Sequence, residues 1–221
     1  TDGSGSIACR YPTKLPGGGW AGVTASSSHS VAWQRHGVMW AWGDNYHAQL
    51  GIGYRSKQLR PVQIPGRWIQ AAAGFKHVVA LKNNGSLWSW GRNDKGQRGD
   101  PSQQLAMQPV RISQDNNWTH VAAGSMHSLG FRGGNLWAWG ANDNGQLGDG
   151  TSNKLLQPVR IGRARWQTVS SGLHHSTAIR YDGALWAWGR NEYGQLGDGT
   201  KNSHSEPIQV QALGTWKDIA T

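Results

Sequence analysis

The chain has 221 residues, among them 32 glycines, 14 tryptophans and a single cysteine, and its formal net charge is +10 at pH 7. One cysteine, Cys9, excludes an intramolecular disulfide framework and a cysteine-rich zinc site. Regularly recurring apolar residues exclude a disordered chain, no apolar run reaches the roughly 18 residues of a membrane span, and the positive charge favours an acidic partner surface or a polyanion.

The predicted elements begin with one outer strand within residues 1–19, after which a single pattern repeats along the chain. Tryptophan pairs occur in WAWG at 40–43, 137–140 and 186–189, and in WSWG at 88–91. A second series of tryptophans keeps a period near 49 residues: Trp20, Trp68, Trp118, Trp166 and Trp216. Such a period is typical of a propeller or a solenoid array. It divides the chain into repeats 20–67, 68–117, 118–165 and 166–215, with a last partial repeat at 216–221.

Each repeat contains four strand-like runs in the same order. An inner strand of small residues such as WTHVAAG precedes a second strand such as HSLGF, a tight glycine turn, the LWAWG strand, a long loop and an outer strand such as QPVRI. Asn-Gly and Asp-Gly pairs suit tight hairpins, and the apolar period of 3.6 residues that helices require is missing. We therefore predict an all-β fold, a β-propeller of four-stranded antiparallel blades.

The repeat count predicts four complete blades plus two partial blades, all in one propeller domain over residues 1–221. Two middle strands are lacking between the first outer strand and the last inner strand, so these two cannot pair with each other. We therefore predict part of a seven-bladed propeller, in which closure needs further sequence or another chain.

The consensus LWAWGxNxxGQLGDGT…PVxI…WxxVxxGxxHs resembles the repeat of the regulator-of-chromosome-condensation family, in its bacterial form. The resemblance covers essentially the whole chain in four consecutive copies. It implies a propeller fold, whereas the functions in this family range over exchange factors, photoreceptors, ubiquitin-ligase modules and an enzyme inhibitor. Resemblance to bacterial members also implies a secreted or cell-surface location. Ala48, Ile52 and Arg98 depart from the loop pattern in the first two repeats.

The loop GxNxxGQLGDGT is interpreted as scaffold and not as an ion or phosphate site. Its polar residues are mostly amides in the wrong register for calcium, and no Gly-Lys-Ser/Thr followed by a helix is found, as a phosphate loop requires. One histidine per blade, at 29, 77, 127 and 175, is expected to be neutral and to bond blade backbone. We expect no metal, no cofactor and no catalytic residue.

Positions that vary between repeats are the candidates for partner binding. The turn after the inner strand and the middle of the long loop both vary, and strand direction places them on one face. The predicted partner-binding residues are Tyr46, His47, Phe75, Lys76, Lys95, Ser125, Met126, Leu173, His174, Glu192 and Tyr193. This mixture of aromatic, methionine and charged residues is typical of protein interfaces, although tolerant loop tips would show the same variation.

The opposite face is predicted to be basic. Its predicted residues are Arg35, Arg67, Lys82, Arg132, Arg163, Arg165 and Arg180. A solvated rim would account for them, and the alternative is weak, sequence-independent binding of a polyanion or nucleic acid.

The sequence therefore predicts a non-catalytic protein-interaction propeller, not an enzyme and not a membrane protein, with another protein as its partner. One alternative is a regulator of an enzyme, either a guanine-nucleotide exchange factor or an active-site inhibitor. The other alternative is polyanion or nucleic-acid binding through the basic face.

Overall fold

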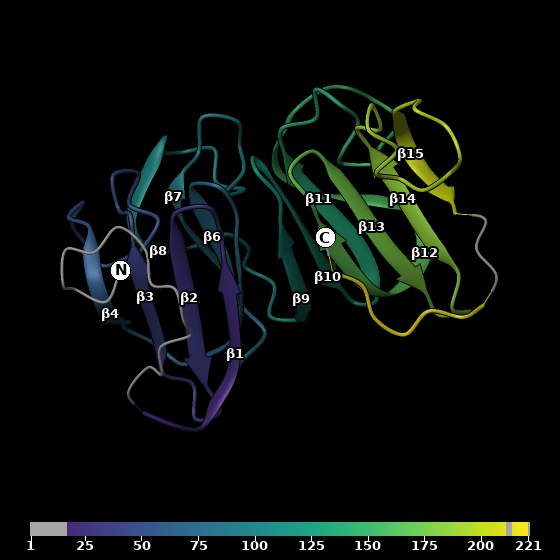
Figure 1. The fold of residues 1–221 in the computed structure, drawn as a ribbon. Helices are drawn as coiled ribbons and strands as arrows, with labels where there is room; N and C mark the ends of the chain where they lie inside the picture. The colour runs from purple at the N-terminus through teal and green to yellow at the C-terminus, as the bar shows by residue number, and fades with distance from the viewer. Residues whose placement is uncertain (1–16, 211–213, 221) are drawn as a thin grey trace, which may run out of the picture.

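The computed structural model describes residues 17–210 and 214–220, which form fifteen β-strands and no helix (Figure 1). Consecutive strands pair antiparallel and arrange into blades of four, which confirms the predicted all-β propeller class. No described segment could cross a membrane as a helix. The strand predicted within residues 1–19 lies almost entirely outside the described residues, and the number of blades in a complete ring stays a prediction.

Blades 1 and 2 are separate four-stranded sheets, each with strands in chain order from the inner to the outer edge. Blade 1 consists of β1 (Trp20–Ala25), β2 (His29–Gln34), β3 (Met39–Gly43) and β4 (Gln58–Ile64). Blade 2 consists of β5 (Trp68–Ala73), β6 (His77–Lys82), β7 (Leu87–Arg92) and β8 (Leu105–Arg111).

Blades 3 and 4 share one long strand and form a single seven-stranded sheet. Their strands are β9 (Trp118–Ala123), β10 (His127–Arg132), β11 (Asn135–Gly140), the shared β12 (Leu155–Ser171), β13 (His175–Arg180), β14 (Leu185–Gly189) and β15 (His204–Gln209). The sequence predicted a connection between an outer and an inner strand near residues 162–165, and the structure has continuous strand there. Gly162, with φ 56°, supplies the bend inside β12.

The inner strand predicted at 216–221 is not a strand in its described part, since residues 214–220 pair with no described strand. The segment nevertheless keeps the first contact of the repeat. The Trp216 amide donates to the Gly183 carbonyl at 3.0 Å, as Trp68 does to Gly37 and Trp118 to Gly85.

Three tryptophans pack together in each of blades 2, 3 and 4. In blade 3, Trp118 meets Trp137 and Trp139 edge to face, with ring centroids 5.9 and 6.0 Å apart. The same arrangement joins Trp68 to Trp88 and Trp90, and Trp166 to Trp186, whereas the Trp188 ring is tilted at 44° to that of Trp166. Edge-to-face pairs add to the energy of burial, and Trp68, Trp118 and Trp166 of the periodic series are core residues, whereas Trp216 is 40% exposed.

Each of these tryptophan clusters is also bonded to the preceding blade. The indole Nε1 of Trp139 donates to the backbone carbonyl of Gln97 at 3.0 Å, and Trp90 and Trp188 bond Gln49 and Gln146 in the same way. At the two later junctions a serine adds a second bond to that carbonyl, from Ser128 to Gln97 and from Ser176 to Gln146, both at 2.8 Å.

The repeated histidines extend these junctions. His77 Nε2 lies 2.8 Å from Ser128 Oγ, and His127 Nε2 lies 3.1 Å from Ser176 Oγ. Because each hydroxyl already donates to a carbonyl, the histidine Nε2–H must donate to it, which defines the neutral Nε2–H tautomer. The histidines were expected to bond blade backbone, and for His77 and His127 this was wrong, since their ring partner is a side chain of the next blade.

Burial keeps these rings neutral. It lowers the pKa of His77 and of His127 to about 3 and that of His29 to about 4. The junction between blades 1 and 2 departs from the others, because Val78 stands where Ser128 and Ser176 stand later. His29 is 3% exposed, and neither of its ring nitrogens has a partner among the described residues.

Candidate protein-binding face

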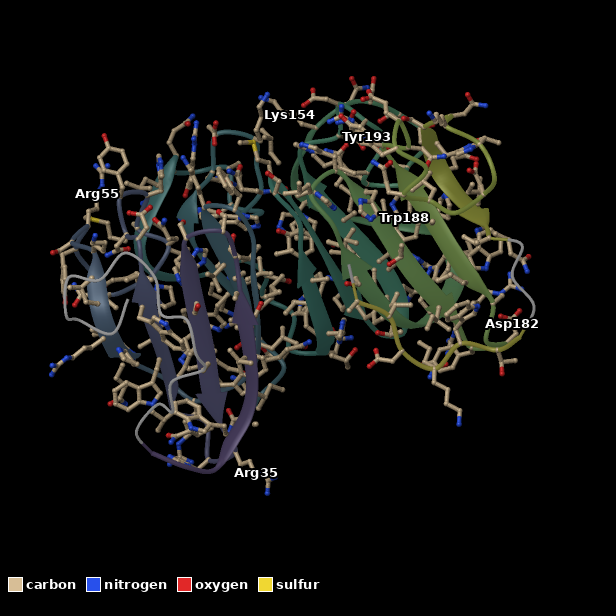
Figure 2. The ribbon with its side chains drawn as sticks, in the orientation of Figure 1. Arg35, Arg55, Lys154, Asp182, Trp188 and Tyr193 are labelled. Atoms are coloured by element: carbon tan, nitrogen blue, oxygen red, sulfur yellow. The ribbon has the colours of Figure 1, made fainter. Side chains whose placement is uncertain are left out.

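Two sets of loops form one end of the propeller, which we call the upper face. The turns after the inner strands bond to the long loops that follow the tryptophan strands. These bonds join Ser28 to Asp44, Lys76 to Arg92, Met126 to Ala141 and His174 to Arg190, with distances of 2.8–2.9 Å. Figure 2 shows Arg55, Lys154 and Tyr193 along this edge, and Arg35 and Asp182 at the opposite edge.

The repeated polar residues of the long loops are engaged within the loops. The side-chain carbonyl of Asn142 accepts the amide of Leu147 at 2.9 Å, and its Nδ2 donates to Asp149 at 2.9 Å. Asn45, Asn93 and Asn191 make the equivalent amide contacts. These groups are satisfied locally, which supports the interpretation of the motif as scaffold.

The predicted partner-binding residues all lie on the upper face, with different exposure. The most exposed large side chains are Tyr46 at 65%, Leu173 at 67% and Tyr193 at 82%. Glu192 is also exposed, whereas the rest are half-buried: His47, Phe75, Lys76, Lys95, Ser125, Met126 and His174. The two exposed aromatic tips, Tyr46 and Tyr193, belong to the loops of blades 1 and 4.

Several of these tips are held by charged neighbours. Arg55 lies 4.6 Å from the centre of the Tyr46 ring, and Arg190 lies 5.7 Å from that of Tyr193. Arg190 also forms an ion pair with Glu192. Cations over aromatic faces restrict ring motion, so Tyr46 and Tyr193 are oriented before any partner arrives.

The inner strands of the four blades line a hollow of about 640 Å³. Its wall is made of small residues and of the turn residues Phe75, Ser125 and Leu173. The turns are linked around the wall, since the Phe75 amide donates to Ser125 and the Ser125 amide to Leu173, both at 3.2 Å. The upper face therefore has a recessed centre and aromatic tips at its rim.

Sequence reasoning missed Tyr54, Arg55 and Lys57, which are exposed in the blade 1 loop. Arg55 donates from Nε to the carbonyl of Tyr46 at 2.6 Å and so belongs to the same surface. The signal was available, because this loop departs from the repeat at Ile52 and carries YRSK where blade 3 carries TSNK.

The predicted basic face is only partly available to a ligand. Lys82 lies 3.5 Å from the centre of the Trp88 ring, and Arg132 lies 3.7 Å from that of Trp137. Arg180 lies 5.2 Å from the Trp186 ring and forms an ion pair with Asp182. These three cations cover the tryptophan clusters, a role in the fold that the sequence prediction did not include.

The other predicted basic residues are exposed: Arg35, Arg67, Arg163 and Arg165. Arg163, however, lines a hollow of about 370 Å³ between blades 3 and 4 together with Asp149 and Glu206. The two acids reduce its attraction for a polyanion. Among the described residues, no group of three metal-ligating side chains converges.

The family model of the RCC1-like domain matches residues 6–221. No curated protein sequence matches the chain significantly. The fold is similar to the crystal structure of human WBSCR16, with a TM-score of 0.84 and 22% identity over 91% of this chain and 55% of that one.

Yeast RCC1 (Prp20) is similar in two crystal structures. The complex with Kap60 gives a TM-score of 0.81 and 25% identity over 91% of this chain and 51% of that chain. The structure of Saccharomyces cerevisiae Prp20p, described with its binding properties to Gsp1p and histones, gives 0.82 and 24% over 91% and 53%. This chain spans little more than half the length of these proteins.

Proposed function

The chain belongs to the RCC1-like domain family, and from this premise we propose that it is a non-catalytic interaction propeller whose upper face binds a protein partner. One observation carries the proposal. The repeated polar groups of the loops are used to build the face, whereas the tips that differ between blades remain exposed and include Tyr46, Leu173 and Tyr193. Aromatic residues around a recessed centre are typical of protein-binding surfaces.

The relatives support a protein as the partner class. Prp20 has been crystallised with Kap60 and studied for its binding to Gsp1p and histones. These partners belong to Prp20, and their identities are not transferred to this chain. Regulation of an enzyme by exchange or inhibition would use the same surface, and it remains an alternative within the proposal.

The serine–histidine pairs at the blade junctions favour a non-catalytic function. His77 and Ser128 are separated by a distance that a nucleophile and its base would also adopt. Both residues are fully buried, and the serine proton is donated to Gln97. His77 is therefore the donor to that oxygen and not its base, and the pair stabilises the junction.

The proposal is tested by separating binding from folding. Phe75→Ala, Met126→Ala and Tyr193→Ala are combined in one variant, and a protein captured by the wild-type chain is titrated against both forms. We expect affinity to fall by at least about tenfold, since a few anchors carry most interface energy, while the unfolding midpoint changes little. Trp139→Ala is the folding control and should cost about 3–5 kcal/mol. Unchanged affinity in the triple variant would show that the partner binds elsewhere.

A further inference from the structure

The upper face is divided by charge between its two halves. Blades 3 and 4 contribute the acids Asp143, Asp149, Glu192, Asp198 and Glu206 against the cations Lys154, Arg190 and Lys201. The loops of blades 1 and 2 contribute the exposed or half-buried cations Arg55, Lys57, Lys76, Arg92 and Lys95 against Asp44, Asp94 and Asp100. Blades 1 and 2 therefore form the basic half of this face, and blades 3 and 4 the acidic half.

Two of the five cations of the basic half are paired with carboxylates, and three are not. Arg92 Nε lies 2.7 Å from Asp94, and Asp44 accepts a bond from Gln49 at 2.7 Å. Lys95 reaches Asp143 across the boundary at 4.0 Å. Among the described residues, no carboxylate lies within ion-pair distance of Arg55, Lys57 or Lys76.

One of these three cations contacts His47, and a second lies over the ring of the neighbouring Tyr46. Lys76 Nζ lies 2.9 Å from His47 Nε2, and because an ammonium can only donate, the imidazole accepts this bond. The Tyr46 ring stacks edge-on against His47 at 5.0 Å and supports Arg55 on its own face. We call Lys76, His47 and Arg55 the Lys76 site.

The donors of this site exceed the acceptors around it. Lys76 gives one of its three N–H groups to His47, and Arg55 gives Nε–H to the Tyr46 carbonyl, which leaves the Nη groups of its guanidinium without a partner among the described residues. Burial, followed by Lys76 and Arg92, lowers the pKa of His47, with Arg55 adding to this and Asp44 opposing it. Lys76 and Arg55 therefore create a positive electrostatic potential around the half-buried, neutral imidazole of His47.

We infer that the Lys76 site binds a carboxylate of an acidic segment of the partner, an inference that rests on the upper face being the partner-binding surface. The carboxylate accepts from Lys76 Nζ and from the Arg55 guanidinium, which favours charge-assisted and bidentate bonds. The acidic half of the face repels the same segment, so its acidic residues lie over blades 1 and 2. The Tyr46 ring beside Arg55 contacts the apolar part of an acidic side chain.

The experiment uses an octaglutamate peptide as the probe at low ionic strength, with affinity and the His47 titration measured by NMR. The double variant Lys76→Gln/Arg55→Gln is compared with Lys154→Gln/Lys201→Gln, which removes the same charge from blades 3 and 4. We expect the first double variant to weaken binding about tenfold, or about 1.4 kcal/mol, and the second to change it less than about twofold. Peptide binding should also raise the pKa of His47, because a bound carboxylate stabilises the imidazolium.

Three results would overturn the inference. Equal weakening by both double variants would mean that only net charge attracts the peptide. An unchanged His47 titration at saturation would mean that the carboxylates bind away from the site. An octathymidylate that binds as tightly as the peptide, and is lost in the same variant, would make the site a phosphate site.

The inference and the proposed function fail in different ways. If octaglutamate does not bind at the Lys76 site while the Phe75, Met126 and Tyr193 substitutions still lower the affinity for the captured partner, the inference is wrong and the proposed function is supported. If the peptide binds as expected but those substitutions leave partner affinity unchanged, the inference about the carboxylate site stands and the proposed interface falls.

Discussion

Arg98 is the one buried guanidinium among the described residues, and replacing it with leucine should stabilise the protein. Its side chain is fully buried, whereas the equivalent positions in the other blades are Leu50, Leu147 and Leu196. Nη2 donates to Asp100 at 2.8 Å and to the Gln103 carbonyl at 3.1 Å, but Nε and Nη1 have no partner among the described residues. Burial also lowers the pKa of this guanidinium.

The magnitude follows from these contacts. Two unpartnered buried donors each cost about 1–3 kcal/mol, and replacing a buried ion pair with apolar residues is often neutral or stabilising by about 1–4 kcal/mol. Asp100 is not left alone, because the amide and hydroxyl of Ser102 both bond its Oδ1. Leucine is smaller than arginine, and the space left behind offsets part of this gain. We therefore expect Arg98→Leu to raise the free energy of unfolding by about 1–3 kcal/mol.

Urea unfolding, followed by tryptophan fluorescence, measures this change in the free energy of unfolding. In thermal unfolding, each kcal/mol corresponds to a change of about 2–4 °C in Tm. The matched control is Leu147→Arg in blade 3, which buries a cation where none is accommodated and should destabilise by about 3 kcal/mol or more. If Arg98→Leu proved less stable than the wild type, its ion pair with Asp100 would be worth more than the desolvation of the charge, and the reasoning would be refuted.

Three further predictions concern the junctions and the basic face. Ser128→Val should lower the free energy of unfolding by about 1–3 kcal/mol, because His77 Nε2 loses its acceptor. A Ser128→Val variant as stable as the exposed control variant Thr119→Val would contradict this. Since burial holds the pKa of His77 and His127 at about 3 against 6.5 in the unfolded chain, only the unfolded chain takes up these protons below pH 6.5. As the pH is lowered from 6.5, the free energy of unfolding should then fall by about 1.4 kcal/mol per pH unit for each histidine until pH 3 is approached. Urea unfolding measures this change, and an equally steep fall in the double variant His77→Gln/His127→Gln as in the wild type would contradict the prediction. Any nucleic-acid binding should be weak and should weaken steeply as the salt concentration rises. It should be lost when three exposed arginines of the basic face are replaced by glutamate: Arg67, Arg163 and Arg165. A nucleic-acid affinity that does not change with salt in a titration would exclude this face as the binding site.

The fold was predictable because its signals are local and repeated. The tryptophan period, the glycine turns and the alternation in LWAWG each locate one part of a blade. Because all three recur in four copies, each copy supports the assignment of the others. The blade junctions were less accessible. Nothing in the sequence separates a histidine that bonds its own backbone from His77, which bonds Ser128 about fifty residues later.

The candidate face was predictable in position but not in composition. Strand direction alone places the turns and the long loops on one end, as the backbone bonds between them show. The cation–aromatic contacts of Lys82, Arg132 and Arg180 depend on side-chain direction across strands, so the predicted basic face included residues that cover the core. Arg55 was missed because only the middle of the long loop was assigned to the face, although the position of Arg55 also varies between repeats, with Ser152 in blade 3 and Lys201 in blade 4.

Val78 has a consequence for the way in which the propeller comes apart. In a linear array each unit is stabilised mainly by its neighbours, so cooperativity is limited by the weakest coupling between adjacent units. The junction of blades 1 and 2 has the Trp90 bond to Gln49 but lacks the serine link, and it leaves both His29 nitrogens without partners among the described residues. Blade 1 should therefore open as a separate foldon, and its amides should exchange with solvent sooner than those of blades 2 to 4.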